Sequence, residues 1–333
     1  MKIVPTYSNF IIAIFLFVLA FWGIHYTADW EGYTYAFYNT DMARDRAFSF
    51  LAEFFYEKGL NYRDLFHFHI VLMGVLFSIF YYKLKANPIL FVALTLFVGY
   101  VGIGNQIRYY VAFPLVLMAC LYWFKKKRMM SIICFLIALY FHYTIIIVYF
   151  LFIFMDLVIN RAEKRKWQII VLMNLFIFFL VYKSNFMMEE QYSAYKNLDK
   201  TSSFAGGLFN LTPLIISIYY LKNISLREVQ LFNTEAEFLY ILLISSLPLF
   251  FLSIYMQITG SRMLMALLPC YMCFFVKARR CINDIHTRKM CTRAISLTLV
   301  YFVFWRFFIP LLCGVNGAMI TELRMMVESY YLW

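Results

Sequence analysis

Apolar stretches of about 15–20 residues recur along the chain and alternate with short polar segments. This pattern is typical of a polytopic α-helical membrane protein, because a helix needs about 20 apolar residues to cross the hydrocarbon core of a bilayer. A transmembrane β-barrel would instead show alternating segments of about 10 residues, and none are visible. We therefore predict an all-α integral membrane protein with spans at approximately residues 10–26, 66–82, 88–103, 109–124, 167–182, 207–221, 238–257, 263–276 and 295–313.

Residues 129–159 form a single apolar region of about 31 residues, which would make a helix of about 46 Å. That is too long for one upright span and too short for two ordinary ones. The basic clusters KKKR (125–128) and RAEKRK (161–166) flank the region, and both favour the cytoplasmic side. We therefore predict a hairpin of two short helices, or a re-entrant loop, with its turn near YFHYT (140–144). The chain then has about 10–11 segments in one helical domain, residues 1–333, with a cytoplasmic N-terminus.

Composition and charge agree with this organisation. Of the 333 residues, 64% are hydrophobic and only 14% are charged. This hydrophobic fraction exceeds what the core of a soluble protein needs. The net charge of +12 falls in short loops beside the spans, so the positive-inside rule explains it better than nucleic-acid binding does. Cys270 and Cys273 form a CxxC, but no further Cys or His nearby completes a metal set, which favours buried packing thiols. We expect no metal, no cofactor and no nucleic-acid partner.

The longest polar segment, about residues 28–65, is too short to fold alone and is predicted to lie on the outer face. Within it, residues 48–57 place Phe50 and Phe54 on one side of a helix and Glu53 on the other. This predicts a short amphipathic helix in the membrane interface.

The same segment supplies acidic and aromatic side chains. Its candidate bases are Asp29, Glu31, Asp41, Asp45, Glu53, Glu57 and Asp64. Its aromatic residues could stack on sugar rings or form an aromatic belt at the interface: Trp30, Tyr33, Tyr35 and Tyr38. We take Asp29 and Glu53 as candidate catalytic residues and Tyr33 as a candidate substrate-binding residue.

The stretch GIGNQIRYYVAF (102–113) places Arg108, with Asn105 and Gln106, between two apolar runs with almost no loop. Arg262, in ITGSRMLM, occupies a similarly small turn on the same predicted side. Arginine suits phosphate because its planar guanidinium can donate two parallel hydrogen bonds. The alternative is that both arginines extend to lipid headgroups. We predict a shared anion site at the outer interface.

His142 lies at the predicted turn of the hairpin. Non-helical backbone at membrane depth is tolerated only where it lines a cavity or is buried in protein. We therefore treat His142 as a candidate catalytic residue that takes a proton or orients the acceptor. A hydrogen-bonded packing histidine is the alternative. His67 and His69 are two residues apart and would point apart on a helix, which argues against a metal site.

Taken in order, these motifs resemble the EpsG/Wzy family of polysaccharide polymerases, over about residues 25–280. The pieces are DWEGY (29–33), NQIRYYVA (105–112), KKKR (125–128), HYT (142–144) and GSR (260–262). Two positions depart from the family pattern, since Tyr109 stands where many relatives have Gln and H-x-T replaces the usual H-x-S.

The resemblance implies an enzyme that joins oligosaccharide repeat units carried on undecaprenyl diphosphate, at the outer face of the bacterial inner membrane. We expect a metal-independent glycosyltransferase, because no DxD-like pair is evident. Its partners would be the lipid-linked substrate, membrane lipids, and a chain-length regulator and flippase of the same pathway. Two alternatives are a lipid-linked oligosaccharide flippase or other transporter, and a membrane acyltransferase that uses a histidine as base: His25, His67 or His69.

Overall fold

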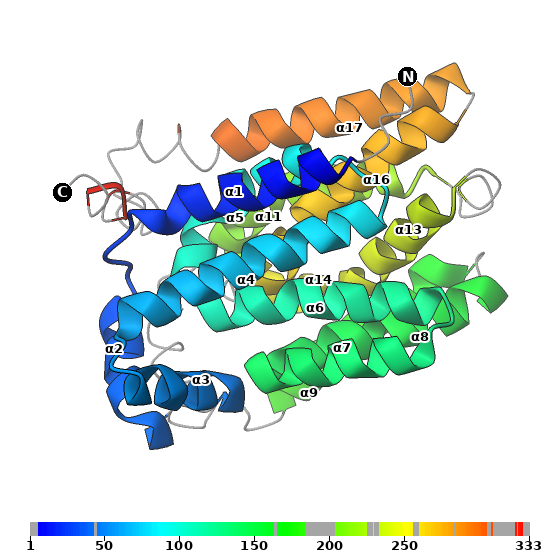
Figure 1. Ribbon diagram of the computed structural model, residues 1–333. Helices are drawn as coiled ribbons and strands as arrows, with labels where there is room; N and C mark the ends of the chain where they lie inside the picture. Colours follow the sequence, from blue (N-terminus) through cyan, green and yellow to red (C-terminus); the bar gives the residue numbers. More distant parts are fainter. Residues whose placement is uncertain are drawn as a thin grey trace. The chain divides into compact units, whose positions relative to one another are not determined.

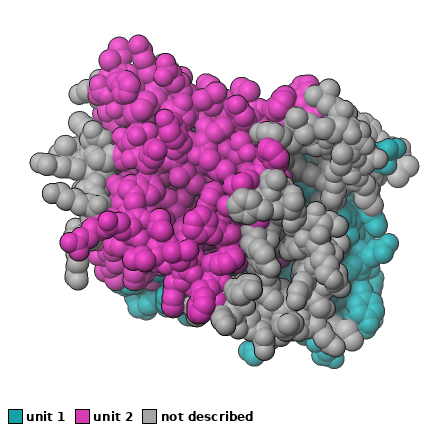
Figure 2. All heavy atoms as spheres, turned by 180° about the vertical axis from the view of Figure 1, so that it is seen from behind, with its two compact units in different colours: residues 1–150, 316–333 teal, residues 151–315 magenta. Residues whose placement is uncertain are grey.

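The computed structural model describes residues 6–42, 45–162, 165–183, 204–224, 233–255, 260–282 and 284–304, with residues 229, 308, 324 and 326–328. These residues are mostly helical and include no β-strand, which confirms the all-α prediction (Figure 1). The chain divides into two compact units, which Figure 2 colours separately. Unit 1 comprises residues 1–150 and 316–333, and unit 2 comprises residues 151–315.

Four helical segments of the described chain are long and apolar enough to cross a membrane: α4 (Tyr62–Lys83), α5 (Pro88–Asn105), α6 (Ile107–Phe124) and Thr234–Ile254. The last comprises α13 (Thr234–Ser246), the short turn η5 (Leu247–Leu249) and most of α14 (Phe250–Tyr255). Five shorter helices are also apolar: α1 (Tyr7–Trp22), α7 (Arg128–Phe141), α8 (Ile146–Ala162), α9 (Lys166–Lys183) and α11 (Phe204–Leu221). Two further helices are α16 (Leu268–Cys281) and α17 (Ile285–Val303). This is the architecture of a polytopic α-helical membrane protein.

The central helix of unit 1 is α6, which contacts α4, α5 and α7. Every side chain from Tyr109 to Leu121 is buried. The ring of Phe77 on α4 lies 5.9 Å from Phe17 on α1 and 6.5 Å from Phe113 on α6. A helix packed on several sides in this way is held in place, and so is its first turn, which carries Arg108.

The basic turns of unit 1 lie at the end opposite Arg108. The turns after α4 and α6 are closed by Lys85 (φ 50°) and Lys126 (φ 59°), in the left-handed conformation that glycine usually adopts there. The ammonium of Lys83 lies 5.4 Å from the ring centroid of Tyr122, so the ends of α4 and α6 are neighbours. Arg108 is separated from this end by the length of α6, about 27 Å at 1.5 Å per residue.

The predicted hairpin is present. After α7, His142 is extended (φ −162°, ψ 112°) and is followed by the short turn η2 (Tyr143–Ile145). Tyr149 in α8 then lies back against α7: its ring stacks on Phe135 at 4.2 Å, and its hydroxyl is 2.7 Å from that of Ser131. Because Phe135 and Tyr149 are equally far from His142 in sequence, the chain reverses at His142.

The long polar segment folds into α2 (Trp30–Tyr38), the turn η1 (Thr40–Met42) and α3 (Arg46–Glu57), ahead of α4. In Figure 1, α2 and α3 lie at the end of unit 1 where α4 and α6 begin. The α3 helix packs against α4 and α7, buries Phe48 and leaves Phe50 exposed. Its placement in a membrane interface stays a prediction.

Unit 2 contains a helix break whose backbone groups are satisfied by one side chain. Pro248 lies in η5, between α13 and α14. Asn174 on α9 donates to the carbonyl oxygen of Leu247 (2.7 Å) and accepts from the backbone N–H of Phe251 (3.1 Å). Proline breaks are tolerated in apolar helices when a neighbouring group restores the lost hydrogen bonds. Asn174 therefore stabilises this part of unit 2.

Candidate functional site

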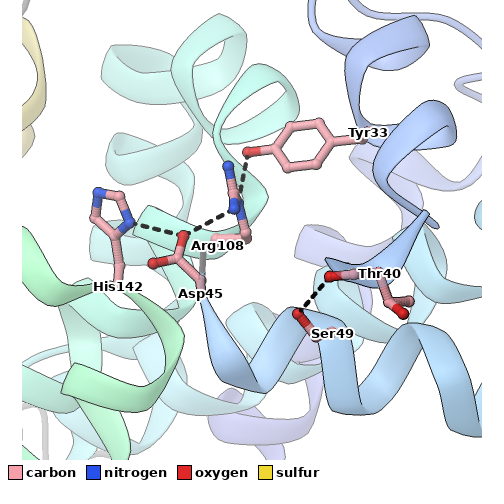
Figure 3. A network of polar contacts seen from close by, with 6 residues as sticks. All are labelled: Tyr33, Thr40, Asp45, Ser49, Arg108 and His142. Carbon is pink, nitrogen blue, oxygen red and sulfur yellow. Dashed lines mark hydrogen bonds and ion pairs between the residues drawn. The ribbon is translucent and has the colours of Figure 1, made fainter. Parts of the chain in front are cut away.

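Four side chains far apart in sequence meet in unit 1, near the start of α6 (Figure 3). One carboxylate oxygen of Asp45, Oδ2, lies 2.9 Å from Arg108 Nη1 and 3.2 Å from His142 Nδ1. On the other side of the guanidinium, Arg108 Nε donates a hydrogen bond to the Tyr33 hydroxyl at 3.4 Å. We call these four residues the Arg108 cluster.

Asp45 is positioned by the start of α3. It is the N-cap residue, and its carbonyl oxygen accepts hydrogen bonds from the backbone N–H groups of Phe48 and Ser49. An N-cap aspartate usually also caps the helix with its side chain. The Asp45 side chain makes no such bond and turns toward Arg108 and His142 instead. The residue thus does two separate things: its backbone begins a helix, and its carboxylate holds the cluster.

The electrostatics of the cluster follow from its burial. The Asp45 side chain is 4% exposed, and a carboxylate this deep in protein requires a compensating charge, which Arg108 supplies. The guanidinium carbon of Arg108 also lies 5.0 Å from the ring centroid of Tyr33 and 5.5 Å from that of Phe48, within cation–π range. Arg108 keeps 26% of its side chain exposed, so a ligand can reach it.

His142 is oriented by Asp45. Its Nδ1 contacts the carboxylate, and the ring of Tyr109 packs against it edge-on, with centroids 5.5 Å apart. Its Nε2 is buried and has no hydrogen-bond partner among the described residues. Donation from Nδ1 to Asp45 leaves the lone pair on Nε2, where a neutral imidazole accepts a proton. A carboxylate that fixes the tautomer of a histidine is the arrangement of a general base.

Asn105 and Gln106 lie in the turn between α5 and α6. Asn105 is buried, and its side-chain oxygen accepts a hydrogen bond from the backbone N–H of Ala28 at 3.1 Å. It therefore ties the turn that carries Arg108 to the segment that leads into α2. The Gln106 side-chain oxygen is buried and lacks a hydrogen-bond partner among the described residues.

The two acidic candidates lie elsewhere. Asp29 is exposed at the start of α2, within electrostatic range of Tyr62. Glu53 is on the exposed side of α3, where it accepts a hydrogen bond from the Thr40 hydroxyl at 3.1 Å. The carbonyl oxygen of Thr40 in turn accepts a bond from Ser49 at 3.2 Å, which Figure 3 also shows. The described contacts of Glu53 thus join it to η1 rather than to the Arg108 cluster.

Arg262 belongs to unit 2. It is half-buried in a π-helical turn, η6 (Gly260–Leu264). The two arginines lie in different units, so their convergence on one anion stays a prediction.

Asp45 is the residue that sequence reasoning did not single out. It was one of seven acids in the same polar segment, and no local motif separates it from the others. The one available signal was its position just before an amphipathic helix, but N-cap aspartates are common and seldom catalytic.

The histidines near α4 are held by backbone groups. His67 Nε2 contacts the Trp22 carbonyl oxygen at 2.9 Å, and His69 Nδ1 contacts that of Leu65 at 2.8 Å. His25 lies before α2, where burial and the nearby Arg63 guanidinium lower its pKa. Among the described residues, no group of three or more His, Cys, Asp or Glu side chains is arranged to hold a metal ion. Metal independence stays a prediction.

An ion-paired cluster at one end of a bundle of apolar helices defines the class: an integral membrane protein with a polar site built on an arginine, a carboxylate and a histidine. The sequence model of the EpsG family matches residues 8–312, which include the whole Arg108 cluster. The chain belongs to the EpsG family, as its motifs indicated, and the family suggests a polysaccharide polymerase. No curated protein and no solved structure is similar enough to match it.

Proposed function

We propose that this protein is a polymerase that joins oligosaccharide repeat units carried on undecaprenyl diphosphate, at the outer face of a bacterial inner membrane. The observation that carries the proposal is the shared carboxylate of the Arg108 cluster. Asp45 contacts both a cation suited to phosphate and a histidine suited to proton transfer. A glycosyl transfer from a lipid diphosphate needs both of these groups.

In the proposed reaction, an acceptor hydroxyl attacks the anomeric carbon of the donor sugar. The new glycosidic bond forms as the bond from that carbon to the diphosphate oxygen breaks. His142 Nε2 takes the hydroxyl proton, and the lipid diphosphate leaves with the bonding electrons. Arg108 stabilises the negative charge on the leaving diphosphate, which is the electrostatic form of catalysis.

Arg108 has hydrogen-bonding capacity to spare for this role. A guanidinium carries five N–H donors. Nη1 faces Asp45 and Nε faces Tyr33, which leaves donors on both terminal nitrogens for a ligand. The two contacts fix the plane of the guanidinium before a substrate arrives, so less conformational freedom is lost on binding.

The distribution of basic residues supports an outer-face site. Lys83, Lys85 and the cluster 125–128 lie at the opposite end of unit 1 from Arg108. Basic loops stay in the cytoplasm, so the end with the Arg108 cluster would face outward. A cytoplasmic N-terminus follows, since α1 begins at the basic end of unit 1.

The proposal extends to the remaining partners. A metal-independent transfer fits an arginine that supplies positive charge by itself. The lipid-linked oligosaccharide would reach the site from the membrane, and a flippase and a chain-length regulator would act before and alongside the polymerase.

No observation favours the two alternatives. An acyltransferase would use His25, His67 or His69 as its base. Among the described contacts, His67 and His69 are each oriented by a backbone carbonyl, whereas His142 shares a carboxylate with an arginine. Asp–His pairs also relay protons in membrane transporters, so the Arg108 cluster does not by itself separate a proton-coupled flippase from a polymerase, and the gel experiment below does.

Gene deletion with complementation tests the proposal, with surface polysaccharide separated on a gel. Loss of a polymerase removes the ladder of long chains and retains the single-unit product. Loss of a flippase removes both, and loss of an acyltransferase leaves the ladder intact and removes only the acyl group. Either of the last two outcomes would contradict the proposed function.

A further inference from the structure

Tyr62, the first residue of α4, has a hydroxyl that the described protein leaves without a hydrogen-bond partner. The residue is only 2% exposed, and its hydroxyl oxygen is out of contact with solvent. Native proteins satisfy the large majority of their buried polar side-chain atoms, so each exception requires a reason. A ligand that is absent from the unbound protein is one such reason.

The same helix shows that this fold can satisfy a buried tyrosine. Tyr81, near the other end of α4, is 1% exposed, and its hydroxyl is 2.9 Å from that of Thr95. Tyr149 is likewise bonded to Ser131. The missing partner at Tyr62 is therefore a property of its position and not a general feature of the buried tyrosines.

That position is beside the Arg108 cluster. The ring of Tyr62 lies parallel to that of Tyr33, with centroids 6.0 Å apart and an interplanar angle of 7°. Trp30 packs edge-on against Tyr62 at 4.8 Å. Tyr33 is the residue that accepts the hydrogen bond from Arg108, and the Tyr62 hydroxyl is within electrostatic range of Arg108 and Asp29. The unsatisfied hydroxyl thus lies next to the proposed diphosphate site.

We propose that Tyr62 is a further substrate-binding residue, whose hydroxyl donates a hydrogen bond to a phosphate oxygen of the group that Arg108 binds. This inference rests on the proposed function. A tyrosine hydroxyl has one proton to donate, and a phosphate oxygen bound by the spare N–H donors of Arg108 carries negative charge. A hydrogen bond to such an oxygen is stronger than a neutral one. Because Trp30 and Tyr33 already hold the ring, little side-chain entropy is lost when the ligand binds.

The test compares two Tyr→Phe variants of the full-length protein in lipid nanodiscs, with farnesyl diphosphate as the probe and farnesol as the control for tail binding. Tyr62→Phe is expected to bind farnesyl diphosphate about 10–100-fold more weakly, the loss typical of one hydrogen bond to a charged group. The midpoint temperature of its thermal unfolding is expected to equal or exceed that of the wild type, since the Tyr62 hydroxyl has no hydrogen-bond partner in the described protein to lose. Tyr81→Phe is expected to do the reverse: lower the midpoint and keep the affinity.

Two results would overturn the inference about Tyr62. One is wild-type affinity in Tyr62→Phe. The other is a lowered thermal midpoint in that variant, because it would mean that the hydroxyl already has a partner in the protein. Arg108→Ala separates this failure from failure of the proposed function. Weak binding by Arg108→Ala with normal binding by Tyr62→Phe removes only the role of Tyr62. Undiminished binding by Arg108→Ala contradicts the diphosphate site itself.

Discussion

Asp45 is the residue on which the site depends, because one of its oxygens contacts both Arg108 and His142. An isosteric amide at this position keeps the volume and loses the charge. Arg108 would then lack its buried counter-ion, and His142 would no longer be held in one tautomer.

We expect Asp45→Asn to reduce chain extension by about 10²–10⁴-fold at normal protein level, the range seen when a general base loses its action. The matched control is Glu328→Gln, which changes an exposed carboxylate of unit 1 that pairs with Arg324. The measurement is the length distribution of surface polysaccharide. If Asp45→Asn and Glu328→Gln give the same wild-type ladder, Asp45 is merely a helix N-cap.

His142 is tested by removing its imidazole. If Nε2 takes the acceptor proton, His142→Ala should slow extension by about 10²–10⁴-fold, the usual contribution of a general base. His286→Ala serves as the control, since His286 is exposed on α17. Polymer of normal length from His142→Ala would leave His142 as a packing residue held by Asp45.

At the scale of elements, Gly104 at the end of α5 packs against Met326, a residue in the C-terminal part of unit 1. Met326 is fully buried, and an added Cβ at Gly104 would lie 2.5 Å from its terminal methyl carbon. Gly104 directly precedes Asn105, so this contact bears on the turn that carries Arg108. Met326 lies beyond the residues that match the family model, which end at residue 312.

Gly104→Ala should therefore lower the free energy of unfolding by about 1 kcal/mol, the low end of overpacking costs, because the clashing atom is the flexible end of the Met326 side chain. Met326→Ala removes the atom that clashes, so the double variant should be more stable than the sum of the two single changes predicts, by about 0.5–1 kcal/mol. Gly32→Ala is the control, because nothing lies within 4 Å of a Cβ added there. The measurement is thermal unfolding in detergent of five proteins: the wild type, the two single variants, the double variant and the Gly32→Ala control. Strict additivity would show that Gly104 and Met326 are not in contact.

At the scale of the whole molecule, an Arg108 cluster on the outer face requires the basic turns to lie on the opposite, cytoplasmic side of the membrane. Single cysteines introduced into a cysteine-free protein report this directly. Cysteines at Lys126 and Arg165 should label only from the cytoplasm, and a cysteine at the exposed Tyr56 on α3 only from outside. Labelling of Lys126 and Arg165 positions from opposite sides would mean that the hairpin does not return the chain to its starting side.

Much of this architecture was predictable, because its causes are local in sequence. The length of apolar runs fixes which segments can span a bilayer, and the two basic clusters around the hairpin fixed its reversal at His142. The pairing of Asp45 with Arg108 and His142 has no local cause. It depends on where α3 packs against α7, which no hydrophobic period encodes. For the same reason Glu53 could not be separated from Asp45 before the fold was known.

The central claim is that Arg108 binds the diphosphate of the lipid-linked substrate, and Arg108 variants at matched membrane expression test it most directly. Arg108→Ala should lose about 10²–10³-fold in rate, by analogy with loss of one donor to a developing negative charge, and should retain only single-unit product. Arg108→Lys should restore the ladder only in part, because lysine keeps the charge and lacks the planar pair of donors. Arg128→Ala, which removes an arginine stacked on Trp123 at the opposite end of unit 1, should give a normal ladder. Equal ladders from the wild type, Arg108→Lys and Arg108→Ala would contradict a diphosphate-binding role and leave Arg108 as the structural counter-ion of Asp45.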